Sequence, residues 1–179
     1  MSSRPTTIVD ANFNIAYGCM PGNKTTVADA VRAYIQSPLK SEHRTFVKVP
    51  RDLWPPKWHK QGYHNAMCLL VRALYGHPEA GGHWERHLTN ALKALGGAPV
   101  QGHPSCYWFP NERLLLTVYV DDLLLSGPAC NHDSMWQKIA KSVEIEPPEP
   151  LNRFLGRYHE INPCKAPDYN IIKYFNVDA

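Results

Sequence analysis

The segment Thr117–Ser126 reads TVYVDDLLLS and sets two adjacent aspartates, Asp121 and Asp122, between two apolar runs. Aspartate is disfavoured in strands and neighbouring carboxylates repel each other, so this arrangement costs stability unless something compensates. One compensation is a tight hairpin turn, where aspartate is common and water is near. The other is a bound divalent cation, since carboxylate oxygens suit Mg²⁺ or Mn²⁺. A metal site also needs a carboxylate from elsewhere in the chain, and Asp29 is one candidate.

The segments around this one predict an antiparallel sheet. Cys106–Phe109, Arg113–Tyr119 and Leu123–Gly127 are mainly apolar runs separated by short polar turns, which is typical of consecutive strands. The other expected elements are strands at Thr25–Ala28 and Arg153–Glu160, a strand or hairpin over Arg44–Trp54, and helices over Met67–Tyr75, Glu79–Leu95 and His132–Val143. Their order predicts an α+β fold in which helices cover one face of an antiparallel sheet.

Composition and charge narrow the class of protein. The 179 residues are 44% apolar and 20% charged, which is typical of one globular domain. No apolar run reaches the roughly 18 residues that a membrane-spanning helix needs, so we expect no membrane partner. Residues 1–60 hold nine basic and four acidic side chains, against six and nine in residues 121–179. The basic first third fits either a nucleic-acid partner or an ordinary solvated surface.

Cysteine usage points to a cellular compartment. The five cysteines are widely spaced and form no CxxC pair, so we expect neither a disulfide framework nor a cysteine zinc site. This pattern favours a reducing environment. Residues 1–7 lack the apolar core of a secretion signal. We therefore expect an intracellular protein, in a cytoplasmic particle or the nucleus, that is not secreted.

Several segments resemble a known family in the same order along the chain. The motif Tyr119-Val-Asp-Asp122 between apolar strands resembles motif C of reverse transcriptases, and the other segments resemble the copia-type retrotransposon branch. Asp29-Ala-Val-Arg-Ala-Tyr34 is similar to motif A, in which an aromatic residue follows the aspartate by five positions. The remaining matches are to a proline-bearing hairpin, to the start and end of motif B, and to the primer-grip strand: Phe46–Pro50, Arg72–Gly76, His83–Arg86 and Phe154–Gly156.

The resemblance covers residues 25–160 and implies a fold. It implies a reverse-transcriptase palm, a ferredoxin-like antiparallel sheet with helices on one face, together with partial fingers. Residues 1–24 would be an N-terminal extension or truncated fingers, and residues 161–179 a C-terminal tail.

The resemblance also implies an activity, that of an RNA-directed DNA polymerase that uses two Mg²⁺ (or Mn²⁺) ions for nucleotidyl transfer. Asp29 and Asp121 would bridge the ions, and Asp122 would be the accessory carboxylate. The implied partners are an RNA or DNA template–primer, a deoxynucleoside triphosphate and the rest of a Pol polyprotein. The implied nucleotide-binding residues are Tyr34, Gly76 and Glu79, and the implied contacts with primer or template are Tyr119, Val120, Phe154, Leu155 and Gly156.

The chain departs from the family pattern between Gly76 and His83, where Glu79 stands in place of a glutamine and a proline in place of a lysine. The added negative charge would repel a triphosphate unless a cation screens it. Residues 1–24 contain no counterpart of the basic fingers strand, and the sequence holds little of a thumb. One alternative is therefore a catalytically inactive retroelement remnant that keeps the palm fold and binds nucleic acid weakly or not at all. Another is a structural or interaction domain in which the two aspartates form only a turn.

Overall fold

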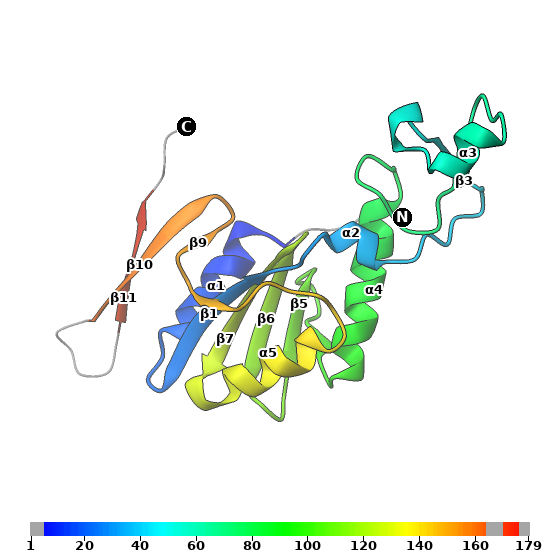
Figure 1. The fold of residues 1–179 in the computed structure, drawn as a ribbon. Helices are drawn as coiled ribbons and strands as arrows, with labels where there is room; N and C mark the ends of the chain where they lie inside the picture. Colours follow the sequence, from blue (N-terminus) through cyan, green and yellow to red (C-terminus); the bar gives the residue numbers. More distant parts are fainter. Residues whose placement is uncertain (1–5, 164–169, 176–179) are drawn as a thin grey trace.

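A six-stranded antiparallel sheet forms the centre of the protein, whose computed structural model describes residues 6–163 and 170–175 (Figure 1). In spatial order the strands are β4 (Ala98–Pro99), β5 (Cys106–Phe109), β6 (Leu114–Tyr119), β7 (Asp122–Pro128), β1 (Asn23–Asp29) and β8 (Glu149–Pro150). The predicted run of three consecutive strands around the aspartates is confirmed as β5, β6 and β7. Strand β1 comes from much earlier in the chain and pairs with β7 along seven residues.

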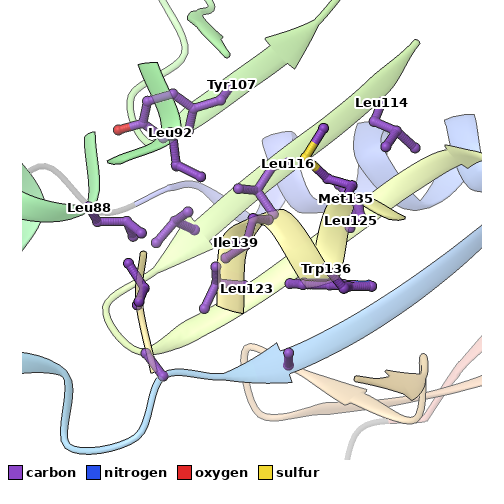
Figure 2. Packing of buried hydrophobic residues seen from close by; sticks show 14 of the residues in the cluster. Leu88, Leu92, Tyr107, Leu114, Leu116, Leu123, Leu125, Met135, Trp136 and Ile139 are labelled. Atoms are coloured by element: carbon purple, nitrogen blue, oxygen red, sulfur yellow. The ribbon is translucent and has the colours of Figure 1, made fainter. Parts of the chain in front are cut away.

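One face of the sheet is covered by α4 (Ala80–Ala94) and α5 (His132–Ala140), which confirms the two amphipathic helices. Strand side chains alternate between the faces, so every second residue of β6 and β7 points toward these helices. Figure 2 shows the resulting apolar cluster, which includes Leu88, Leu92, Leu116, Leu123, Leu125, Met135, Trp136 and Ile139.

The opposite face is covered by a helix that the sequence analysis did not expect, α1 (Ile8–Gly18). Thr7 begins it with a capping box, because its side chain accepts from the Asp10 backbone N–H while the Asp10 carboxylate accepts from the Thr7 N–H. Ile15 packs against Leu124, which points away from the first helical layer. The expectation of helices on one face only was therefore wrong. The reason is visible in β7, whose unbroken apolar run needs burial on both faces.

Asn14 fastens α1 to the middle of the sheet. Its side chain has no exposed surface, and the two hydrogens of its Nδ2 are shared among three acceptors, the carbonyls of Leu115 (3.2 Å) and Leu124 (3.1 Å) and Thr117 Oγ1 (2.7 Å). A shift of the helix along the strands would break these bonds, so they fix its position, while the Oδ1 of the same amide is buried without a hydrogen-bond partner among the described residues.

A buried polar chain ties α5 to β1 and β7. The Trp136 indole N–H donates to Thr26 Oγ1 (2.8 Å), and this hydroxyl lies 2.8 Å from His132 Nδ1. His132 Nε2 lies 3.1 Å from the Gly127 carbonyl, which only accepts, so Nε2 carries the proton and Nδ1 accepts from Thr26. Burial lowers the pKa of His132, so the ring is held neutral.

A separate small unit lies beyond the N-terminal end of α4 (Figure 1). It contains β2 (Phe46–Lys48), the 3₁₀ turn η1 (Arg51–Leu53), α3 (Pro56–Lys60) and β3 (Met67–Leu69). Helix α2 (Ala33–Gln36) lies instead beside α4, and Ala33 is buried in the main apolar cluster (Figure 1). Of the strand or hairpin predicted over Arg44–Trp54, only Phe46–Lys48 form a strand, and they pair with β3. The predicted helix over Met67–Tyr75 was wrong, because this pairing and a bridge between Pro38 and Arg72 hold the segment extended.

After η2 (Ala129–Asn131), α5 and β8, the chain forms a three-stranded sheet in the order β11-β10-β9. These strands are β9 (Arg153–Phe154), β10 (Arg157–Pro163) and β11 (Asn170–Phe175). The strand predicted over Arg153–Glu160 is interrupted at Leu155 and Gly156, whose φ angles are 51° and 73°. The boundary predicted at residue 160 falls inside β10, and the expected tail contributes β11. Within the described ranges, no helix is long and apolar enough to span a bilayer.

Candidate functional site

Two of the predicted carboxylates lie opposite each other at the end of β1 and the start of β7. Asp29 and Asp122 are direct partners in the antiparallel register, and Asp122 also faces Tyr119 across the β6–β7 hairpin. Residues directly opposite on one sheet face have Cβ atoms only about 5 Å apart. The cross-strand partner of Asp29 is Asp122, and the bridging role expected for Asp29 and Asp121 stays a prediction.

The electrostatics of this pair are unfavourable without a cation. The pKa of Asp122 is raised from 3.8 to about 6, first by burial, then by the charge of Asp29 and a hydrogen bond with it, and then by Asp121. Arg153 opposes this rise only in part. A partly buried carboxyl group with this neighbour binds either a proton or a cation near neutral pH.

The turn that joins β6 to β7 consists of Val120 and Asp121, and the backbone carbonyl of each residue accepts a hydrogen bond. The Trp84 indole Nε1–H donates to the Val120 carbonyl (2.5 Å), and the Ala30 backbone N–H donates to the Asp121 carbonyl (2.8 Å). Val120 has a φ of 57°, in the left-handed region that a β-branched residue rarely adopts. The turn is thus fixed by contacts with α4 and with the residue after β1.

Two tyrosines lie beside the acidic turn. The rings of Tyr34, on α2, and Tyr75 have centroids 4.4 Å apart and are tilted by 43°. Burial, then the charge of Asp121, then Tyr34 raise the pKa of Tyr75. Tyr75 therefore lies near the acidic turn, a placement not expected from the sequence, although the residue belongs to the segment compared with the start of motif B.

Comparison with known proteins assigns the family. Residues 20–173 match the family model described as "Reverse transcriptase (RNA-dependent DNA polymerase)". The chain belongs to the reverse transcriptase family. It is 27% identical over 105 residues to a putative transposon Ty5-1 protein of Saccharomyces cerevisiae, and 28% identical over 106 residues to a retrovirus-related Pol polyprotein from transposon RE1 of Arabidopsis thaliana. These matches confirm the copia-type retrotransposon resemblance.

Both relatives are longer than the matched region. Each alignment covers 57% of this chain, but only 34% of the yeast protein and 7% of the Arabidopsis polyprotein. The aligned region thus spans about a third of the yeast protein and less than a tenth of the Arabidopsis polyprotein.

Glu79, which departs from the reverse transcriptase pattern, begins α4 as its N-cap residue. Its pKa is lowered, chiefly by a hydrogen bond with Ser41, so it is ionised at neutral pH. Its Oε2 also lies 3.8 Å from His83 Nε2, and both side chains line a pocket with Lys40 and Arg86. The negative charge thus has basic neighbours in Lys40 and Arg86, while Glu42 adds a second acidic group to the pocket. Gly76 lies just before this site with a φ of 88°, which glycine adopts without strain.

The residues compared with the primer grip fall into two environments. Phe154 is buried with Ile15 and Leu124 under α1, so its side chain belongs to the core. Leu155 and Gly156 form the positive-φ turn between β9 and β10. Tyr119, at the end of β6, is exposed. Contact of these residues with nucleic acid stays a prediction.

The carboxylates fit the donor chemistry of a magnesium site. Among the residues that the structure describes, no group of three or more His, Cys, Asp or Glu side chains is arranged to hold a metal ion. Proteins nevertheless bind Mg²⁺ through one or two carboxylates, with water and substrate phosphates as the other ligands. The Asp29–Asp122 pair supplies two carboxylates, and Asp121 stands next to them in the turn.

Proposed function

We propose that this domain catalyses RNA-directed DNA synthesis, as the reverse transcriptase domain of a copia-type retrotransposon. The observation that carries the proposal is the cross-strand pairing of Asp29 with Asp122 beside Asp121. Membership of the reverse transcriptase family supports it. The substrates are a template–primer of RNA or DNA and a deoxynucleoside triphosphate, and the domain acts as part of a Pol polyprotein.

The three aspartates would hold two divalent cations, Mg²⁺ or Mn²⁺. When bound, such ions lower the pKa of a primer hydroxyl and neutralise phosphate charge. Strands β1 and β7 and the hydrogen-bonded turn of Val120 and Asp121 hold the carboxylates in place before substrate binds. Tyr34 and Tyr75 form an aromatic surface next to Asp121, where the sugar or base of a nucleotide would pack.

Primer extension on a short RNA–DNA hybrid tests this proposal, first with Mg²⁺ and then with Mn²⁺. We expect extension by the wild type, and a loss of at least 100-fold in Asp29→Asn and in Asp122→Asn. Asp133→Asn is the matched control, because its carboxylate is highly exposed on α5 and should not alter the rate. Circular dichroism establishes that each variant is folded. No extension by a folded wild type would refute the activity of this chain.

The second candidate is a retroelement domain that keeps this fold without catalysis. The ionised Glu79 favours it, because the family pattern has a neutral glutamine there. A wild type that binds Mn²⁺ and template–primer but extends no primer would support this candidate.

A further inference from the structure

Trp84 makes a contact that joins the helical layer to the acidic turn. It lies on α4 with 2% of its surface exposed, and its indole N–H donates to the carbonyl of Val120 at 2.5 Å. The indole nitrogen is a donor only, so a buried tryptophan must find an acceptor. Its acceptor is the first turn residue, immediately before Asp121.

The hydrogen bond from Trp84 matters because Val120, which accepts it, has a strained backbone conformation. Val120 has a φ of 57°, and a branched side chain clashes with its own backbone in this region. Residues keep such conformations only where the surrounding structure enforces them. The two-residue hairpin between β6 and β7 already demands a positive φ at its first turn residue, and the Trp84 indole and the Ala30 amide each hold one turn carbonyl in that geometry.

The two hydrogen bonds act on opposite ends of the same short turn. The Ala30 amide comes from the residue that follows Asp29, so it ties the turn to the carboxylate of β1. The Trp84 bond ties the turn to the helix packed on the sheet. A turn that relaxed toward an unstrained φ would move the Asp121 carbonyl away from Ala30 and change the spacing of the three carboxylates.

We infer that Trp84 is a positioning residue, which holds Val120 in its left-handed conformation and thereby sets Asp121 and Asp122 against Asp29. Its effect on catalysis rests on the proposed function, whereas its effect on the turn does not.

Trp84→Phe tests the inference, because it keeps an aromatic ring in the core and removes the N–H donor. Trp136→Phe is the matched control: Trp136 is also buried, and its indole also donates one hydrogen bond, to Thr26 Oγ1. The first measurement is hydrogen exchange of the Ala30 backbone amide, corrected for the global stability of each variant. We expect at least tenfold faster exchange in Trp84→Phe and no specific change in Trp136→Phe. Equal exchange in the two variants would overturn the inference.

A second variant separates positioning from packing. Glycine adopts a positive φ without strain, so adding Val120→Gly to Trp84→Phe should restore the slow exchange of Ala30. Loss of packing alone would not be repaired in this way. If Trp84→Phe by itself does not fold, the double variant is expected to fold, and its failure to do so would contradict the inference.

Primer-extension kinetics give the catalytic readout. We expect kcat to fall about tenfold in Trp84→Phe, with KM for the nucleotide changed less than twofold, because carboxylate spacing acts on the chemical step. A wild type without polymerase activity would refute the proposed function, yet the exchange of Ala30 would still decide the role of Trp84. An active wild type whose Trp84→Phe variant keeps full kcat would show that the turn does not limit catalysis.

Discussion

Asp29 and Asp122 face each other as direct partners across β1 and β7, so their carboxyl groups lie close together. Burial and the neighbouring charge raise the pKa of Asp122 to about 6, from 3.8. Between these pH values the folded protein holds a proton that the unfolded chain has released. The stability that this proton provides is therefore present below about pH 4 and is lost as pH rises through about 6.

Removing one charge of this pair should stabilise the fold at neutral pH. We expect Asp29→Asn to raise the free energy of unfolding at pH 7.5 by roughly 1 kcal/mol, after allowance for solvent near the pair. The pKa of Asp122, followed by NMR, should fall toward 3.8. Urea unfolding at pH 7.5 and pH 4 provides the check. A gain of the same size at both pH values would contradict the electrostatic explanation.

His132 should make the domain sensitive to acid. Its pKa is lowered from 6.5, mainly by burial, so the stability it provides is lost as pH falls below about 6.5. Protonation also removes the acceptor that Thr26 uses. Lys24 and Asp133 lie near the ring, and the first lowers its pKa while the second raises it.

His132→Gln isolates this effect from that of Asp122. We expect the wild type to lose more stability than His132→Gln between pH 7 and pH 5, as measured by urea unfolding. Parallel losses in the two proteins would exclude His132 as the source.

Asn14 should contribute strongly to stability although it lies far from the carboxylates. Asn14→Ala removes a buried side chain that donates to Leu115, Thr117 and Leu124, and we expect a loss of about 2 kcal/mol. Asn12→Ala, on the same helix and less buried, should cost less than about 0.5 kcal/mol. Chemical unfolding of the two variants gives the comparison, and equal losses would argue against the anchoring role.

Glu79 should weaken nucleotide binding if the α4 pocket lies near the triphosphate. We expect Glu79→Gln to lower KM for the nucleotide about threefold, and the effect to shrink as salt is raised. Glu160→Gln serves as the control, because Glu160 is exposed on β10 and does not line this pocket. An unchanged KM at low salt would show that the charge of Glu79 is compensated by its neighbours.

The sequence predicted the helices and strands whose own residues carry a clear apolar pattern. The apolar runs of β5, β6 and β7 and the one-sided helices α4 and α5 lie within a few residues of their expected bounds. The extended segment at β3 was missed, because its conformation depends on pairing with β2 about 20 residues away. Helix α1 was missed although Thr7 and Asp10 have the spacing of a capping box, a signal that the sequence contains.

The sequence predicted only those site residues to which a family motif assigns a role. Adjacent aspartates between apolar runs indicated a hairpin, and the hairpin places Asp122 beside Asp29. The contacts of Trp84 and Tyr75 with the acidic turn join residues 36 or more positions apart. Such contacts depend on how α4 and its preceding loop pack, which periodicity does not specify.

Helix α1 ends before the family match begins at residue 20. A shorter protein designed from the boundaries of that match would lack Ile15 and Asn14, and would present Leu124 and the neighbouring β6–β7 surface to water. Exposed strands of this kind associate with one another, so such a protein should aggregate on expression. A folded, soluble form of this domain should therefore include the residues from Thr6 onward.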